Sequence, residues 1–192
     1  MVEFKAFDKN VEVNGETVLS VVAGMGAFKA NALKILKDNG IDNPKAGQWY
    51  PQQDWLDAFK EISEKIGNNT LKMIGAAIPA SAQWPPQVTD INAALGSIDI
   101  AYHMNHRING KPLFDPKTGK ISEGIGHYAF EKTGDRSAKV VCENPYPCPF
   151  DKGLVEAAAK KFAKKGEIVV VEEKSTKCRN DGGKSCTYIV KW

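Results

Sequence analysis

The sequence predicts an α+β fold in which a helical N-terminal half packs on an antiparallel sheet with a further helix. Apolar residues recur at helical spacing through residues 1–110, alternate as in strands from residue 111 onward, and return to helical spacing over residues 151–166. This order of helices, hairpin, helix and hairpin is typical of a domain whose sheet is antiparallel. The length of 192 residues fits one ligand-binding domain over 1–192, mainly helical over 1–110, with strands, one helix and a cysteine cluster over 111–192.

Four helices are expected in the N-terminal half, over residues 18–36, 55–66, 68–79 and 88–108. The first ends at Asp38-Asn39-Gly40, because glycine adopts the left-handed conformation of a helix end at little cost. The second has its apolar residues on one face and its charged residues on the other. Asn68 or Asn69 can cap the third, and Pro79 closes it.

The C-terminal half is expected to hold strands over residues 121–130, 138–143, 168–171 and 187–192. A loop rich in proline and glycine, residues 111–119, precedes the first strand. Asp151 is the expected N-cap of the intervening helix, which ends at Gly166.

Composition excludes several classes of protein. Hydrophobic residues make up 42% and charged residues 26%, so neither a disordered chain nor a membrane protein is favoured. An acidic beginning is unlike a signal peptide, so we expect a cytoplasmic location and no membrane partner. The lysines of residues 160–165 have the spacing of a solvated helix face, so no nucleic-acid partner is expected either. Motifs for a nucleophile elbow, a phosphate loop or a dinucleotide site are absent, which leaves open whether the chain is an enzyme.

All four cysteines lie in the last third of the chain, as Cys142, Cys148, Cys178 and Cys186. Each pair sits where a strand ends or a turn begins, so a hairpin could bring four thiolates together. Four sulfur atoms satisfy a structural, tetrahedral zinc ion. Two disulfides or buried free thiols are the alternatives.

From Val141 to Trp192 the chain resembles the C-terminal half of the 4-vinyl reductase domain family. The resemblance rests on a cysteine before an amphipathic helix, a strand, Cys178 and Cys186 around an internal Gly-Gly, and the final strand Thr187–Trp192. Members include sensory domains of activators that respond to phenol or toluene and proteins tied to bacteriochlorophyll synthesis. Their fold is related to that of trafficking-complex subunits and, more distantly, to heme nitric-oxide-binding domains.

The resemblance implies a pocket for a small hydrophobic or aromatic ligand between helices and sheet, beside a structural zinc. In the aromatic-sensing members a glutamate three residues before the equivalent of Cys178 helps to bind zinc, and Ser175 stands there in this chain. A site of four sulfur atoms is therefore favoured over one that uses Glu172 or Glu173.

The three histidines offer a second site. His103 and His106 lie near the end of the fourth helix, and His127 lies in the strand expected over residues 121–130, one residue after Gly126. They could bind iron, bare or in heme, with Asp99 orienting His103 from one turn away. Ordinary structural histidines are the alternative.

The same region supplies the candidate residues of a ligand pocket. The expected ligand-binding residues are Tyr102, His103, His106, Arg107, His127, Tyr128 and Trp84. Arg107 could instead neutralise the C-terminus of its helix, and each aromatic side chain could simply be core.

Two hypotheses follow. The leading one is a cytoplasmic binding or sensor protein with a structural zinc and a pocket for a small hydrophobic or aromatic molecule, whose occupancy is read by a partner or in a homodimer. The alternative is a heme or non-heme iron protein or enzyme that uses His103, His106 and His127.

Overall fold

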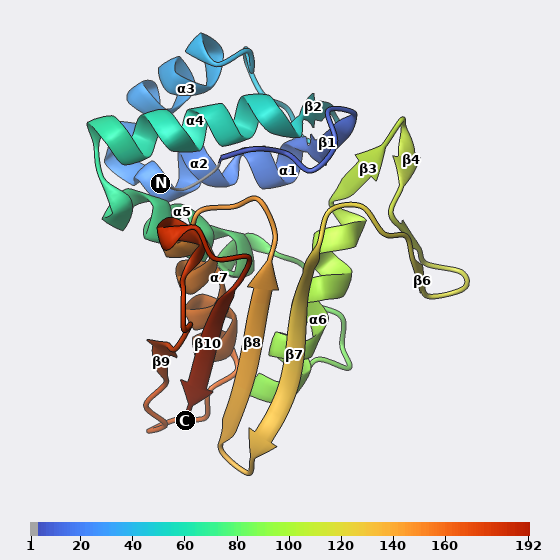
Figure 1. Ribbon diagram of the computed structural model, residues 1–192, viewed down its shortest axis with the longest axis vertical. Coiled ribbons are helices and arrows are strands. Elements are labelled where there is room, and N and C mark those ends of the chain that lie inside the picture. Colours follow the sequence, from blue (N-terminus) through green and yellow to red (C-terminus); the bar gives the residue numbers. More distant parts are fainter. Residues whose placement is uncertain (1–3) are drawn as a thin grey trace.

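The computed structural model describes residues 4–192 and confirms the α+β class (Figure 1). The helices are α1 (Gly15–Val18), α2 (Ser20–Met25), η1 (Gly26–Phe28), α3 (Lys29–Asp38), α4 (Gln52–Lys65), α5 (Asn68–Ser81), α6 (Ile91–Met104), α7 (Cys148–Lys161) and η2 (Arg179–Asp181). The strands are β1 (Val11–Asn14), β2 (Trp49–Pro51), β3 (His106–Ile108), β4 (Lys111–Pro112), β5 (Phe114–Asp115), β6 (Lys120–Ile121), β7 (His127–Gly134), β8 (Ser137–Glu143), β9 (Val170–Glu173) and β10 (Cys186–Lys191).

The main sheet has the order β7-β8-β10-β9, and every neighbouring pair is antiparallel. Helices α6 and α7 lie against one face of this sheet (Figure 1). Side chains alternate accordingly: Val140 and Cys142 on β8 and Tyr188 and Val190 on β10 are buried. The sheet and these two helices hold most of the residues proposed from the sequence.

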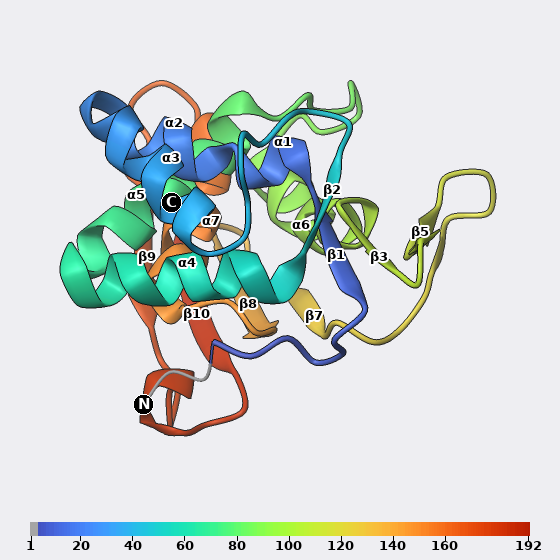
Figure 2. The same cartoon turned by 90° about the horizontal axis from the view of Figure 1, so that it is seen from above.

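Helices α5 and α7 cross at very short range, because a glycine of each faces the backbone of the other. A Cβ at Gly75 would lie 2.0 Å from the carbonyl oxygen of Phe150, and one at Gly153 would lie 2.0 Å from that of Lys72. Any larger residue forces the helices apart. Helices α1 to α4 lie together in both views, and α2 packs on α5 (Figures 1 and 2).

A smaller sheet of order β2-β1-β3-β4 joins the N-terminal region to the end of α6. The sequence did not predict β1 to β4, because strands of two to four residues carry too few side chains for alternation to show. The hairpin of β5 and β6 projects from the body in both views (Figures 1 and 2).

Several helix boundaries differ from expectation, and the N-cap of α5 is Gly67 rather than Asn68 or Asn69. The predicted helix over 88–108 is shorter, since α6 starts after the N-cap Asp90, whose side chain accepts from the backbone N–H of Ala93, and residues 106–108 form β3. Pro79 lies inside the last turn of α5 rather than closing it. The predicted helix over 18–36 is divided into α1, α2, η1 and α3, although it ends at Asp38 as expected.

Asp151 is not an N-cap. Helix α7 begins at Cys148 after Pro147, so Asp151 lies in its first turn, where it is fully buried, and the helix ends at Lys161 rather than Gly166. The strand expected over 121–130 is divided into β6 and β7, because Gly124 and Gly126 adopt φ values of +133° and +77° between them.

Contrary to expectation, one helical stretch is long and apolar enough to cross a membrane by length and composition. It spans Gly15–Asp38, with a mean hydropathy of 1.3 over its best window. Core helices of proteins with no membrane contact pass the same test, and Val18, Val21 and Leu36 of this stretch are buried in the core. This stretch is weak evidence for a membrane span.

Candidate functional site

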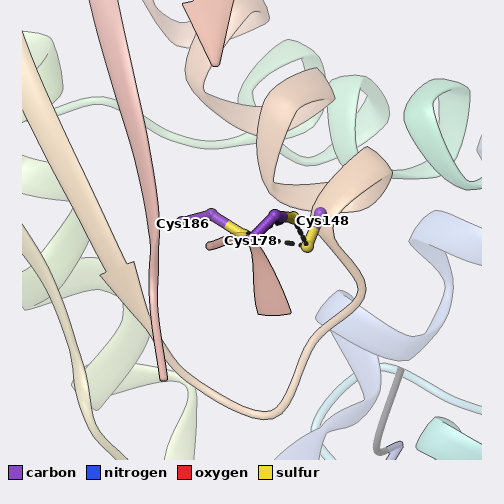
Figure 3. Close-up of side chains that lie close together, drawn as sticks. All are labelled: Cys148, Cys178 and Cys186. Atoms are coloured by element: carbon purple, nitrogen blue, oxygen red, sulfur yellow. Dashed lines mark hydrogen bonds between the residues drawn. The ribbon is translucent and has the colours of Figure 1, made fainter. Parts of the chain in front are cut away.

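Three of the four cysteines meet at one point (Figure 3). The Sγ atom of Cys148 lies 2.8 Å from that of Cys186 and 3.1 Å from that of Cys178, and the last two are 3.3 Å apart. Cys148 opens α7, Cys178 precedes η2 and Cys186 opens β10, so the fold brings the start of α7 to a segment 30 to 38 residues further along the chain. All are free thiols, with Cys148 and Cys186 buried and Cys178 half-buried.

Cys142 does not belong to this group of three sulfur atoms, although it lies opposite Cys186 in the β8–β10 register. Burial raises the pKa of its thiol well above the ordinary value. The pKa of Cys186 is instead lowered, because its sulfur shares a hydrogen bond with Cys148 and the Arg179 guanidinium lies beside it. The cluster therefore contains one thiol that is readily ionised.

A buried ion pair links the cysteines to α7 and β7. Arg179 donates to the carboxylate of Asp151 and, through Nε, to the Cys186 sulfur at 3.5 Å. Asp151 also accepts from the hydroxyl of Tyr128 at 2.5 Å and from the amide of Asn144 at 3.2 Å. Burial raises the pKa of Asp151 despite these partners, whereas Asp151 and Cys186 together more than reverse the effect of burial on Arg179 and raise its pKa.

His106 is held at both ring nitrogens. Its Nδ1 donates to the carbonyl oxygen of Tyr102 at 2.7 Å, and its Nε2 accepts from the Tyr146 hydroxyl at 2.5 Å. That hydroxyl in turn accepts from Gln52 at 2.8 Å. Burial lowers the pKa of His106 to about 4, so the ring is neutral at pH 7 and neither nitrogen is available to a ligand.

His103 and His127 lie together with Asp99, and their rings are 5.1 Å apart, centroid to centroid. The Nδ1 of His103 donates to the carbonyl oxygen of Asp99 at 2.8 Å, and its Nε2 is buried with no partner. His127 lies between two carboxylates, with Nδ1 3.0 Å from Asp99 Oδ2 and Nε2 2.9 Å from Glu123 Oε2. The structure thus separates His106 from the pair formed by His103 and His127.

Aromatic side chains fill the space between α6 and the sheet, where a ligand pocket was expected. The ring of Tyr102 lies 5.2 Å from that of Tyr128 and 6.0 Å from that of Tyr146, centroid to centroid. Tyr102 donates to the carbonyl oxygen of Ile125 at 2.7 Å, so its hydroxyl is also used. Tyr102 and Tyr128 therefore act as core residues in this structure.

Arg107 and Trp84 are placed elsewhere. Arg107 lies on β3, where its guanidinium makes two hydrogen bonds of 2.6 and 2.7 Å to Glu12 and lies over the ring of Trp49. Trp84 donates to the carbonyl oxygen of Pro79 at 3.0 Å and packs on Phe162 after α7. Neither contacts the histidines.

The two best-formed hollows among residues 4–192 do not include a histidine. One, of about 570 Å³, is open to solvent between α2 and α5 and is lined by Ala23, Gly24, Met73, Ala76, Ala77, Ala80 and Ser81. The other, of about 190 Å³, is lined by Asp90, Ile91, Asn92, Asp135, Phe162, Lys164, Glu167 and Trp192.

Four residues of these networks were missed from the sequence: Gln52, Asn144, Tyr146 and Arg179. Two signals were available, since Asn144 and Tyr146 lie between Cys142 and Cys148, and Arg179 follows Cys178. Nothing in the local sequence marks Gln52, because its partner Tyr146 lies 94 residues away.

No family model matches the chain, and no curated protein matches it. The 4-vinyl reductase assignment therefore finds no support in these comparisons.

Solved structures of H-NOX proteins are similar to this chain. An H-NOX protein from S. oneidensis in the Fe(II)NO ligation state has a TM-score of 0.62 at 14% identity over 93% of this chain and 98% of that one. A mutant of T. tengcongensis H-NOX gives 0.61 at 16% identity over 91% and 94%. An oxygen-binding H-NOX domain related to soluble guanylate cyclases, as its oxygen complex, gives 0.61 at 18% identity over 93% and 94%.

At these identities the comparison establishes the fold alone. The α+β fold is that of H-NOX domains, which is the more distant of the relationships that the sequence resemblance implied.

Proposed function

We propose that this chain is a sensor domain of the H-NOX fold that holds a thiophilic metal ion, Zn²⁺ in the first instance, on Cys148, Cys178 and Cys186. The observation that carries the proposal is the convergence of three unbridged sulfur atoms within 3.3 Å of one another. The sensor role is supported by the fold, since one neighbour is described as an oxygen-binding domain related to soluble guanylate cyclases. Residues 1–192 act as one domain in this proposal, and a partner or a second copy reads its state.

The sulfur geometry suits zinc after a small adjustment. Zn–S bonds of about 2.3 Å place the sulfurs of a tetrahedral site roughly 3.8 Å apart. The three sulfurs therefore need to separate by about 0.5 to 1 Å to admit the ion. Structural zinc sites have four protein ligands, whereas three leave a position that a small molecule with a nitrogen, oxygen or sulfur donor can take.

The buried hydrogen bonds around Arg179 can transmit metal or ligand binding at the cysteines to the rest of the fold. Metal or ligand binding at Cys186 changes the charge next to Arg179, which is paired with Asp151. Asp151 belongs to α7 and binds Tyr128 of β7, so one change of charge reaches both a helix and the sheet. A ligand that binds two arrangements of this network with different affinity shifts their populations.

Heme is the second candidate, because similar solved structures are described in terms of heme redox potential and heme distortion. The chain offers one suitable donor, the partnerless Nε2 of the buried His103. It does not offer the space, since Tyr102, Tyr128 and Tyr146 pack against one another beside that helix. The residues therefore do not fit a heme in this arrangement.

Metal analysis of the protein as purified under reducing conditions tests the proposal. We expect about one zinc per chain. Cys178→Ser should lose it, whereas Cys142→Ser should retain it, because the Cys142 sulfur lies outside the group of three. Zinc retained by Cys178→Ser, or a wild-type chain that does not take up added Zn²⁺, would contradict the proposal. Loss from Cys142→Ser would restore the four-sulfur site expected from the sequence.

Titration with hemin tests the second candidate, heme binding. We expect no stoichiometric Soret band from the wild type. A band that appears with one hemin per chain and disappears in His103→Gln but not in His106→Gln would establish the heme hypothesis instead.

A further inference from the structure

The structure contains a second group of metal-binding side chains, where α6 meets the start of β7. One ring nitrogen of His103, one of His127 and one carboxylate oxygen of Asp99 lie within 4.8 Å of one another. We infer that Asp99, His103 and His127 form a binding site for a divalent transition-metal cation, with the carboxylate of Glu123 beside it on the outer nitrogen of the His127 ring. This site is independent of the cysteines.

Two elements bring the donors together. Asp99 and His103 are four residues apart on α6, so both side chains lie on the same face of the helix. His127 is the first residue of β7, which packs against that face. Glu123 lies four residues before His127, in the segment that turns at Gly124 and Gly126.

The separations match those within a metal coordination sphere. His127 Nδ1 is 3.0 Å from Asp99 Oδ2, whereas its Nε2 is 2.9 Å from Glu123 Oε2, a contact that holds the ring from outside the site. Bonds of about 2.1 Å to nitrogen and oxygen place adjacent ligand atoms roughly 3.0 to 3.4 Å apart. A cation can therefore replace the hydrogen bond between His127 and Asp99 with little backbone movement.

The donors are already oriented. Asp99 Oδ1 accepts from the backbone N–H of Tyr128 at 2.8 Å, which fixes the carboxylate. The ring of His103 donates from Nδ1 to a backbone carbonyl, an arrangement common among metal-bound histidines. Its Nε2 is fully buried and lacks a protein partner, a state that costs free energy unless a ligand or water satisfies it.

Charge and access also favour a cation. Among residues 4–192, the ion pairs of Asp99 and Glu123 are with histidines rather than with lysine or arginine. With neutral imidazoles the group carries a formal charge of −2. The side chains of His127 and Glu123 are 38% and 79% exposed, so an ion can enter from solvent on that side. Two histidines and a carboxylate suit Fe²⁺, Co²⁺, Ni²⁺ and Zn²⁺ rather than Mg²⁺ or Ca²⁺.

Co²⁺ is the probe, because its absorption separates the two sites. Metal-free reduced protein is titrated anaerobically with Co²⁺, and bound metal is counted by equilibrium dialysis. A thiolate-bound Co²⁺ gives an intense ligand-to-metal band in the near ultraviolet, and a site of nitrogen and oxygen ligands does not. If the proposed function is correct, the wild type binds two Co²⁺ and shows this band.

We expect His127→Ala to bind one Co²⁺ fewer than the wild type, or to bind that ion at least tenfold more weakly, with the near-ultraviolet band unchanged. This variant should fold because His127 is partly exposed. Cys178→Ser should lose the band and retain the ion bound by His127, so failure of the proposed function leaves this result intact.

His106→Gln is the matched control, since His106 is buried on the same stretch of chain and both its nitrogens are engaged. It should retain the second Co²⁺. The inference is overturned if His127→Ala binds as much Co²⁺ as the wild type, if His106→Gln loses the same ion, or if the wild type binds no Co²⁺ outside the thiolates. In each of those cases His127 serves only as an ion-pair partner of Asp99 and Glu123.

Discussion

Acid should destabilise this protein through the buried His106. Its ring is neutral in the fold and has a pKa of about 4, against an ordinary value of 6.5. Below pH 6.5 the unfolded chain binds a proton at this residue and the folded chain does not, until the pH approaches 4. The contribution of His106 to stability is therefore fully present above pH 6.5 and is lost as the pH falls through this window.

The magnitude follows from the shift in pKa. Each unit corresponds to about 1.4 kcal/mol, so the full window is worth about 3.5 kcal/mol, of which about 2.5 kcal/mol is lost between pH 7 and pH 4.5. This residue is 2% exposed, so solvent screening does not reduce the value much. A loss of this size is a large part of the stability of an ordinary domain.

Urea unfolding followed by tryptophan fluorescence measures it, because Trp55 is fully buried in the core. We expect wild type to lose about 2.5 kcal/mol more than His106→Gln between pH 7 and pH 4.5, whatever the stability of the variant at pH 7. Glutamine retains a neutral hydrogen-bonding group toward Tyr146 and does not titrate.

His127→Gln is the control with the opposite sign. Although burial lowers the pKa of His127, the hydrogen bonds that its ring donates to the carboxylates of Asp99 and Glu123 outweigh this effect and raise that pKa. The stabilisation that His127 supplies is present at low pH and is lost as the pH rises through its raised pKa. His127→Gln lacks this stabilisation, so its free energy of unfolding should fall more steeply in acid than that of the wild type. Parallel pH profiles for wild type and His106→Gln would refute the argument that His106 is neutral because it is buried.

Three further results are expected. Gly75→Ala should lower the free energy of unfolding by about 1 to 3 kcal/mol, measured in urea, because the new Cβ meets the backbone of α7. Gly96→Ala, on the more open α6, should be neutral or stabilising. Equal effects of the two variants would contradict the close crossing of α5 and α7. Asp151→Asn should cost about 3 to 5 kcal/mol, because it leaves a guanidinium buried without its counter-charge, and a loss below about 1 kcal/mol would contradict that pairing. Tyr102→Phe should cost about 1 to 3 kcal/mol by leaving the carbonyl of Ile125 unsatisfied, and a neutral result in the same assay would contradict that bond.

The chain's own periodicity determined the fold class and most of the long elements. The stripe from Trp55 to Ile66 predicted α4, and alternation in residues 138–143 predicted β8, because burial of one face leaves a repeat that is visible in the sequence. The cysteines were also identified as a cluster from their positions near strand ends. These are local signals, so the residues themselves carry them.

Tertiary structure alone decided which of these side chains meet. Aspartate is a common N-cap residue, yet α7 begins three residues before Asp151. Packing of α7 on the sheet then buries the Asp151 carboxylate against Arg179. The convergence of Cys148 with Cys178 and Cys186, without the sulfur of Cys142, depends on where α7 and η2 dock.

Tertiary structure also decided that His103 and His106 have different partners. His106 follows His103 by three residues, yet α6 ends between them, so one ring turns to Tyr146 and the other to His127 and Asp99. A helical repeat predicts which face a residue occupies, but the partner on that face comes from residues about 25 to 40 positions away. Such contacts depend on chain packing, which local sequence does not encode.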